Sequence, residues 1–306
     1  MNTAKEIISS VIAALGIPAV IRNLNQRKAG ILLYHDPEPS VFDTHLDYLT
    51  THYNVVPFER LVGALISRDW SDMPSNAIVL HLDDGYRRNT ELAAICERYG
   101  VIPTLYLCSH VVGTQRRFWS KLDGGRSKRL RLVENTRLLE KLRDEADYTP
   151  DREYEGREAL SKSELSAIAH QFDYQSHGRY HFSMVTLNEA ELVKEAEESR
   201  SRIEELTAQT CEHFSFPYGD YSEREINAVR AVGYKTGRTT RPGWVGPNTD
   251  PYQLPIVADV PGAISTNQLR LQLTGLPRIT KRFIYAYLTR HLYAIRERRL
   301  MSRRVF

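Results

Sequence analysis

Short apolar runs alternate with segments of helical periodicity along most of the chain, and this alternation constrains the fold most strongly. Residues 30–37, 77–80 and 103–108 are apolar runs without helical spacing, which is typical of buried strands. Helical patterns at 42–53 and 91–99 separate them. Further strands are expected at 54–57, 172–175, 213–216, 234–238 and 254–257. Repeated strand–helix units favour a parallel sheet covered by helices, so we predict an α/β fold.

Composition bounds the class of protein. With 306 residues, the chain is long enough for one large α/β domain or two ordinary ones. Its apolar fraction of 42% and charged fraction of 26% are ordinary for a soluble globular protein. Cys96, Cys108 and Cys211 are far apart and show no paired metal-binding spacing. We therefore expect small buried side chains and a reducing compartment, not a disulfide framework.

The first 28 residues form a distinct segment. Apolar residues between 7 and 15 fall on one face of a helix, which Gly16 and Pro18 end before the basic segment 22–28. We expect this helix to pack on the domain; contact with a membrane surface is the alternative. The apolar stretch 7–21 is too short for a bilayer span, and no secretory signal is evident, so we expect a cytoplasmic protein.

The last 30 residues are strongly basic. Nine Lys or Arg and a single acid, Glu297, lie between Arg278 and Arg304. One helical stripe contains the apolar residues and a histidine, namely Ile284, Tyr287, Leu288, His291, Leu292 and Ile295. Two alternatives stay open: a helix packed on the domain, or peripheral contact with the anionic inner face of the membrane. No nucleic-acid partner is expected, because no recognition fold accompanies the basic run.

The strand–helix alternation is interrupted between 113 and 160. Phe118 and Trp119 are followed by a charged helical pattern over 127–146 and a polar loop at 147–156. We interpret this stretch as an insertion that forms a lid or a substrate wall. The expected parts of the chain are therefore an N-terminal helix and connector, 1–29, a main domain, 30–276, with the insertion 113–160, and a C-terminal basic helix, 277–306.

Two adjacent carboxylates, Asp83 and Asp84, follow the apolar run 77–80, and Gly85 then lets the backbone turn sharply. Such a pair is costly to desolvate without a cation or a shared proton. This cost favours a metal or catalytic site. An aspartate that merely caps the next helix is the equal alternative at this point.

Two histidines, His177 and His181, follow the expected strand 172–175. Four positions apart in a helical turn, their imidazoles lie on one side. Neutral imidazole is the commonest metal ligand, and two histidines with one carboxylate leave an open position on zinc. Alone the pair is weak evidence. Because Asp84 also follows a strand, both groups are expected at the edge where barrel enzymes place their chemistry.

Three motifs, in this order, resemble those of the polysaccharide deacetylase family (carbohydrate esterase family 4, NodB-type homology). They are Asp83-Asp84-Gly85, His177-x-x-x-His181 and Phe216-Pro217-Tyr218-Gly219. The early segment Leu33-Tyr34-His35-Asp36 is similar to the exopolysaccharide-modifying branch. The resemblance covers about 30–257 and implies a distorted (β/α) barrel with about seven parallel strands, here with amphipathic helices at both ends.

The resemblance also implies the site residues. Zn²⁺ or another divalent metal would bind Asp84, His177 and His181. Asp83 would be the general base, and the backbone N–H of Tyr218 would help to hold the oxyanion. The implied activity is that of a metal-dependent hydrolase that removes N-acetyl groups from amino sugars of a polysaccharide, an oligosaccharide or a lipid-linked glycan.

The leaving amine needs a proton donor. Many members supply a late histidine, but residues 264–276 contain none. The exopolysaccharide branch uses the histidine of its early Tyr-His segment, which corresponds to His35. We therefore predict His35 as the general acid, with a structural role as the alternative.

Some positions depart from the family pattern. Gly178 stands where Ser or Thr usually follows the first ligand histidine, and the Arg that often braces the base is missing from 215–217 and from 254–256. Arg238 and Arg241 are candidate replacements. These departures keep open a catalytically silent glycan-binding or scaffold protein. The other alternative is a different amide or imide hydrolase on the same scaffold.

Overall fold

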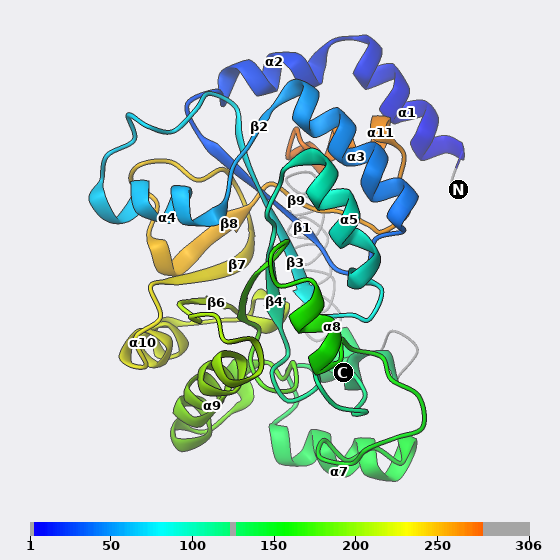
Figure 1. Cartoon of the computed structure of the whole chain (residues 1–306), viewed down its shortest axis with the longest axis vertical. Helices are drawn as coiled ribbons and strands as arrows, with labels where there is room; N and C mark the ends of the chain where they lie inside the picture. The colour runs from blue at the N-terminus through cyan, green and yellow to red at the C-terminus, as the bar shows by residue number, and fades with distance from the viewer. Residues whose placement is uncertain (1–2, 123–126, 278–306) are drawn as a thin grey trace, which may run out of the picture.

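The sheet of this protein curls into a nearly closed barrel with helices on its outside (Figure 1). The structure is a computed structural model, which describes residues 3–122 and 127–277. All strand pairings in the barrel are parallel. The predicted α/β class and distorted (β/α) barrel are therefore confirmed.

The barrel follows the strand order β8-β7-β6-β5-β4-β3-β1-β9, and β2 pairs with β3 outside this path. The strands are β1 Ala29–Tyr34, β2 Asn54–Val55, β3 Ala77–Asp84, β4 Thr104–Leu107, β5 Asp173–Ser176, β6 His213–Ser215, β7 Thr236–Pro242, β8 Leu254–Ile256 and β9 Ala258–Asp259. Because β8 pairs with β7 and β9 pairs with β1, the segment 254–259 joins the two edges. The path has eight strands, not about seven, because this segment is divided at Val257.

The helices between the strands cover the barrel (Figure 1). The α-helices are α1 Thr3–Ala14, α2 Ile17–Leu24, α3 Pro39–His52, α4 Phe58–Ser67, α5 Asn89–Tyr99, α6 Ser127–Leu130, α7 Asn135–Ala146, α8 Lys162–Ala167, α9 Glu189–Thr207, α10 Glu223–Ala231 and α11 Thr266–Gln272. Short 3-10 turns are η1 Trp119–Lys121, η2 Met184–Thr186, η3 Pro217–Gly219 and η4 Pro251–Gln253. Capping boxes begin α8, α9 and α10, which fixes where these helices start.

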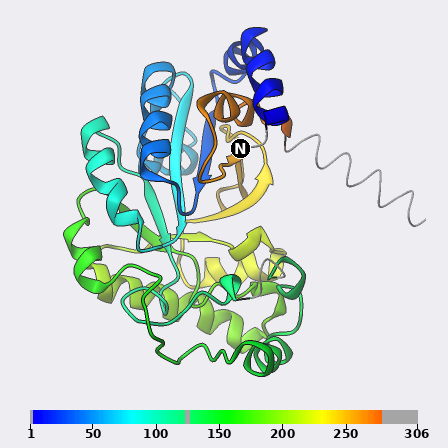
Figure 2. The ribbon, with the colours of Figure 1, turned by 90° about the vertical axis from the view of Figure 1, so that its right-hand side faces the viewer.

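Helix α1 packs against α11, as Figure 2 shows. Ser265 donates a hydrogen bond to the Glu6 carboxylate over 2.7 Å, and Asn267 donates one to Ser10 over 3.1 Å. The helix therefore packs on the domain as predicted, although through its polar side. Within the described residues, no single helix has the length and apolar composition of a membrane span; α1 and α2 meet that test only as a pair bent by 65°.

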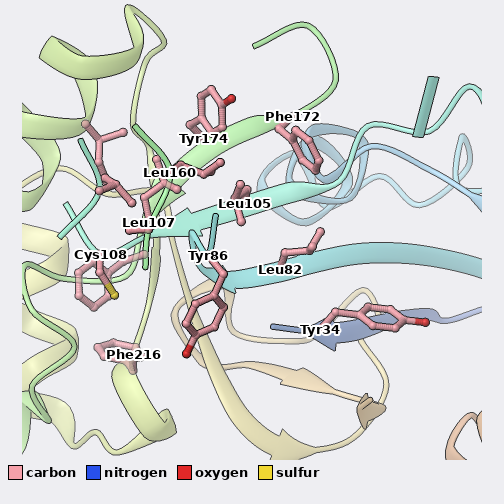
Figure 3. Close-up of a cluster of buried hydrophobic side chains, with 14 of the residues drawn as sticks. Tyr34, Leu82, Tyr86, Leu105, Leu107, Cys108, Leu160, Phe172, Tyr174 and Phe216 are labelled. Carbon is pink, nitrogen blue, oxygen red and sulfur yellow. The ribbon is translucent and has the colours of Figure 1, made fainter. Parts of the chain in front are cut away.

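The strands separate two layers of core residues. Leu82 and Leu105 belong to the larger cluster of buried apolar side chains, part of which Figure 3 shows. Side chains alternate along a strand, so His81 and Asp83 of β3 lie on the opposite face, inside the barrel. Phe58 of α4 reaches this interior, where its ring contacts that of His81. The interior face of β3 therefore carries Asp83 to the carboxyl end of the barrel.

The inserted segment is not one long helix. The pattern over 127–146 predicts a continuous helix, which is wrong, because α6 and α7 are separate. The Glu134 side chain accepts hydrogen bonds from the backbone N–H groups of Thr136 and Arg137 and so starts a new helix. The predicted C-terminal helix and its membrane contact fall outside the described residues, and the domain limits 1–29, 30–276 and 277–306 stay a prediction.

Candidate metal centre

The three predicted metal ligands meet at the carboxyl ends of β3 and β5. Asp84, His177 and His181 are all buried, and their ligand atoms lie within 4.8 Å of one another. Asp84 Oδ1 is 3.7 Å from His177 Nε2 and 3.5 Å from His181 Nε2. The structure thus brings together residues that are almost a hundred positions apart in the sequence.

The histidines have the protonation state that a metal ligand needs. His177 Nδ1 lies 2.8 Å from the Ser215 carbonyl oxygen, which can only accept, so Nδ1 donates and Nε2 keeps its lone pair toward Asp84. Burial, helped by the neighbouring imidazole of His181, holds the pKa of His177 well below its usual value. Burial also lowers the pKa of His181. Both imidazoles are therefore neutral near pH 7.

Asp84 is ionised in the same place. Burial is the largest single effect on the pKa of Asp84 and raises it, but the interactions with the neighbouring imidazoles of His181, His35 and His177 together outweigh burial, so the pKa of Asp84 is lowered. One carboxylate and two neutral imidazoles are a donor set that suits Zn²⁺ or a similar divalent ion. The residues present therefore fit a metal, and their role as its ligands stays a prediction.

Three site residues have left-handed backbone, which is uncommon outside glycine. They are Asp84 at φ 77°, His181 at φ 65° and Tyr218 at φ 60°. Such conformations cost about 1–3 kcal/mol each and persist where the surrounding structure enforces them. Their concentration at this edge of the barrel supports a functional site.

Tyr218, the predicted oxyanion residue, lies beside the histidines. It occupies η3 directly after β6, and its ring centroid is 4.5 Å from that of His181. Trp119 of the insertion is 6.0 Å from the Tyr218 ring and donates its indole N–H to the His181 carbonyl over 3.1 Å. The insertion therefore packs against Tyr218 and the backbone of His181, and its role as a lid or substrate wall stays a prediction.

Asp83, the predicted general base, is buried beside the ligands and paired with a buried arginine. Its Oδ2 lies 3.4 Å from His177 Nε2, and the fully buried guanidinium of Arg238 contacts both Asp83 Oδ2 and Ser215 Oγ. Arg238 is the register partner of Ser215 on the neighbouring strand. Arg241, the other candidate replacement, instead bonds Gln253 near the surface. The charge missing from 215–217 is thus supplied by β7.

His35 lies at the same edge, at the end of β1. Its Nδ1 is 3.7 Å from the carboxylate of Asp259 at the end of β9, and its side chain is 40% exposed. Its charge contributes to the lowered pKa values of Asp84 and His181. His35 is therefore positioned on the solvent side of the site, and its role as general acid stays a prediction.

One site residue, Glu195, belongs to none of the sequence motifs. This buried carboxylate of α9 accepts the backbone N–H of Arg179 over 2.6 Å, within the loop that carries both histidines. A Cβ atom at Gly178 would lie 2.8 Å from Glu195 Oε1, so Glu195 fills the space of the usual Ser or Thr side chain. Its spacing of three and four from buried Leu192 and Ser199 is the only sequence signal.

Glu195→Ala is expected to lower the free energy of unfolding by about 1–3 kcal/mol, because the buried N–H of Arg179 loses its acceptor. Glu195→Gln keeps an oxygen there and should cost less. Denaturant unfolding of both variants beside the wild type measures this difference. Equal losses for Ala and Gln would contradict the bracing role.

The same glutamate predicts a pH effect. Burial raises the pKa of Glu195 from 4.5 to about 7. The folded protein therefore binds this proton more tightly than the unfolded chain, and the resulting stability is present below about pH 4.5 and lost as the pH rises through 7. Glutamine cannot lose this proton, so we expect the Tm of Glu195→Gln, measured relative to that of the wild type, to rise between about pH 5 and pH 8. A difference that stays constant across calorimetric scans would refute this.

A family model described as polysaccharide deacetylase matches residues 71–237, more than half of the 306-residue chain. The matched segment contains Asp83, Asp84, His177, His181 and Tyr218. Arg238 is the first residue after the matched segment, and His35 lies before it in the sequence. No curated protein matches the sequence.

Solved structures share the fold at low sequence identity. The Streptococcus pyogenes deacetylase PplD in complex with acetate is 15% identical, with a TM-score of 0.60 over 80% of this chain and 98% of that one. IcaB from Ammonifex degensii is 14% identical, with a TM-score of 0.57 over 81% and 97%. The putative polysaccharide deacetylase BA0330 from Bacillus anthracis is 16% identical, with a TM-score of 0.58 over 80% and 69%. The family match, on a barrel that these enzymes share, shows that the chain belongs to the polysaccharide deacetylase family.

Proposed function

We propose that this protein is a metal-dependent hydrolase that removes N-acetyl groups from the amino sugars of a glycan. The observation that carries the proposal is the convergence of Asp84, His177 and His181 within 4.8 Å, with Asp83 alongside. Membership of the polysaccharide deacetylase family supports a deacetylation reaction. The exopolysaccharide-type segment at His35 supports a polysaccharide, oligosaccharide or lipid-linked glycan as the substrate.

Zn²⁺ or another divalent ion would be held by the Asp84 carboxylate and the Nε2 atoms of His177 and His181. When bound, such an ion polarises the amide carbonyl and makes water more acidic. The protein contributes ligands that are already desolvated and oriented. The Ser215 carbonyl fixes the tautomer of His177, and Trp119 holds the backbone of His181.

Asp83 is the proposed acceptor of the proton that leaves the attacking water. The buried guanidinium of Arg238 contacts Asp83 Oδ2 and so orients this carboxylate. As the water oxygen adds to the acetyl carbonyl carbon, negative charge develops on the carbonyl oxygen, and the backbone N–H of Tyr218 is the proposed hydrogen-bond donor to it. The C–N bond then breaks and releases acetate.

His35 is the proposed donor of the proton that the departing sugar nitrogen takes up. Its half-exposed imidazole lies at the rim of the site, where Asp259 is close enough to orient it. His35→Gln is expected to lower kcat for acetate release by about 10²-fold or more while metal content stays unchanged. Asp259→Asn is the matched variant and should have a smaller effect. Full activity of His35→Gln would contradict the general-acid role and favour the alternative, a structural role for His35.

The direct test starts from full-length protein purified without added metal. Elemental analysis is expected to find a divalent ion, and acetate release from N-acetylglucosamine oligomers is expected to stop on chelation and return when the ion is restored. A protein that binds no ion and stays inert with added Zn²⁺ would support the silent glycan-binding or scaffold alternative. Turnover of a cyclic imide without acetate would support the other hydrolase.

A further inference from the structure

Helices α1 and α2 lie at the end of the molecule opposite α7 (Figure 1), and they expose apolar side chains to solvent. We call this the α1–α2 face; its side chains, each 53–76% exposed, are Ile7, Ile8, Val11, Leu15, Val20 and Leu24. These are six of the eleven large apolar side chains that are exposed in the described residues. Single exposed apolar residues are ordinary, but a contiguous group of them marks an interaction surface.

The orientation of α1 is the reverse of that of an ordinary surface helix, which buries its apolar side. Ser9 is fully buried, and Glu6 and Ser10 are hydrogen-bonded to α11. The polar side thus holds the helix on the domain. Its apolar side is left for a partner outside the domain described in the structure.

The charges around the α1–α2 face identify the chemistry of that partner. Glu6 is the only acid among residues 1–35, and it faces α11. Lys5, Arg27 and Lys28 are exposed. Elsewhere in the sequence, residues 278–306 carry nine Lys or Arg and one acid. A second copy of the chain would bring these like charges together, whereas an anionic lipid surface is complementary to them.

We propose that the protein attaches to an anionic membrane surface through the α1–α2 face, with both helices lying in the interface. Helix α1 has 12 residues and α2 has 8, and the bend of 65° between them favours an in-plane arrangement over a span. The apolar side chains enter the headgroup–acyl boundary, and the basic residues contact lipid phosphates. This inference is independent of the proposed deacetylase activity.

Co-sedimentation of the full chain with vesicles tests the proposal. Phosphatidylcholine vesicles with about 30% phosphatidylglycerol are expected to bind the protein at least about tenfold better than phosphatidylcholine alone. The double variant Ile8→Glu, Val11→Glu should reduce this binding at least about tenfold. The control Ile66→Glu, Ile102→Glu changes equally exposed apolar residues elsewhere and should stay within about twofold of the wild type.

Because all four substituted side chains are about half exposed, the variants are expected to fold, and thermal melts by circular dichroism verify this. Unchanged vesicle binding by Ile8→Glu, Val11→Glu overturns the proposal and assigns binding to the basic sequence after Pro277. Equal binding to both kinds of vesicle overturns the anionic specificity. A wild type that ignores vesicles but sediments as a dimer, with the double variant a monomer, overturns it in favour of a second copy.

Discussion

Asp83→Asn is expected to lower kcat for acetate release by about 10²–10⁴-fold while the metal content of the protein is retained. The amide is nearly the same size as the carboxylate, but it cannot accept the proton of the attacking water. Asp83 Oδ2 lies 3.4 Å from His177 Nε2, but Asp84 lies close to both histidines, at 3.7 Å from His177 and 3.5 Å from His181. We therefore expect the metal to depend on Asp84 more than on Asp83. Steady-state kinetics and elemental analysis on the same preparation measure the two effects.

The matched control is Asp84→Asn. Asp84 belongs to the group whose ligand atoms lie within 4.8 Å, so its loss is expected to reduce metal content together with activity. The two variants would then distinguish the roles of the neighbouring carboxylates: Asp84 binds the metal, and Asp83 accepts the proton. An Asp83→Asn protein with activity within about tenfold of the wild type would contradict the general-base role.

Arg238→Ala is expected to destabilise the protein by about 3–5 kcal/mol and to reduce deacetylation, because the buried Asp83 carboxylate loses its cationic partner. Arg241→Ala is the control. It removes an arginine three positions away that bonds only near the surface, and it should change the free energy of unfolding by about 0.5 kcal/mol or less. Equilibrium unfolding and acetate release are the measurements.

A rescue variant separates the positioning role of Arg238 from a general packing role. Ser215 is the register partner of Arg238 and contacts the same guanidinium. Ser215→Arg combined with Arg238→Ala places the charge on β6, within the segment where many family members carry it. Partial recovery of kcat relative to Arg238→Ala is expected. If Arg238→Ala retains both full stability and full activity, Arg238 does not support Asp83.

The parts of the site that the sequence predicts are those that local pattern encodes. Asp84 ends β3 and His177 follows β5, and parallel strands bring their carboxyl ends to one edge, so the sequence could predict that these residues lie close together. Their selection as a ligand set with His181 came from the resemblance to the family motifs. Arg238 and Glu195 act across elements. Their partners depend on strand register and on how α9 packs, neither of which is visible as a spacing in one sequence.

The same distinction explains the differences in fold. Alternating patterns predict the barrel, but the strand count changes because the closing segment is divided at Val257. Periodicity groups the apolar residues of α1 correctly, yet it does not say which side of a helix meets the domain. The side of α1 that meets the domain is fixed by hydrogen bonds from Ser265 to Glu6 and from Asn267 to Ser10, and these partners are over 250 positions apart in the sequence.

The backbone at the carboxyl edge of the barrel has a consequence for engineering. Asp84, His181 and Tyr218 occupy conformations that glycine or asparagine would adopt more readily. A laboratory selection for heat resistance alone would therefore favour glycine or asparagine at these positions. Such variants would be more stable, but they would lose the side chains proposed for the active site. Hardier variants of this enzyme are better sought in residues remote from that rim, with turnover scored in every round.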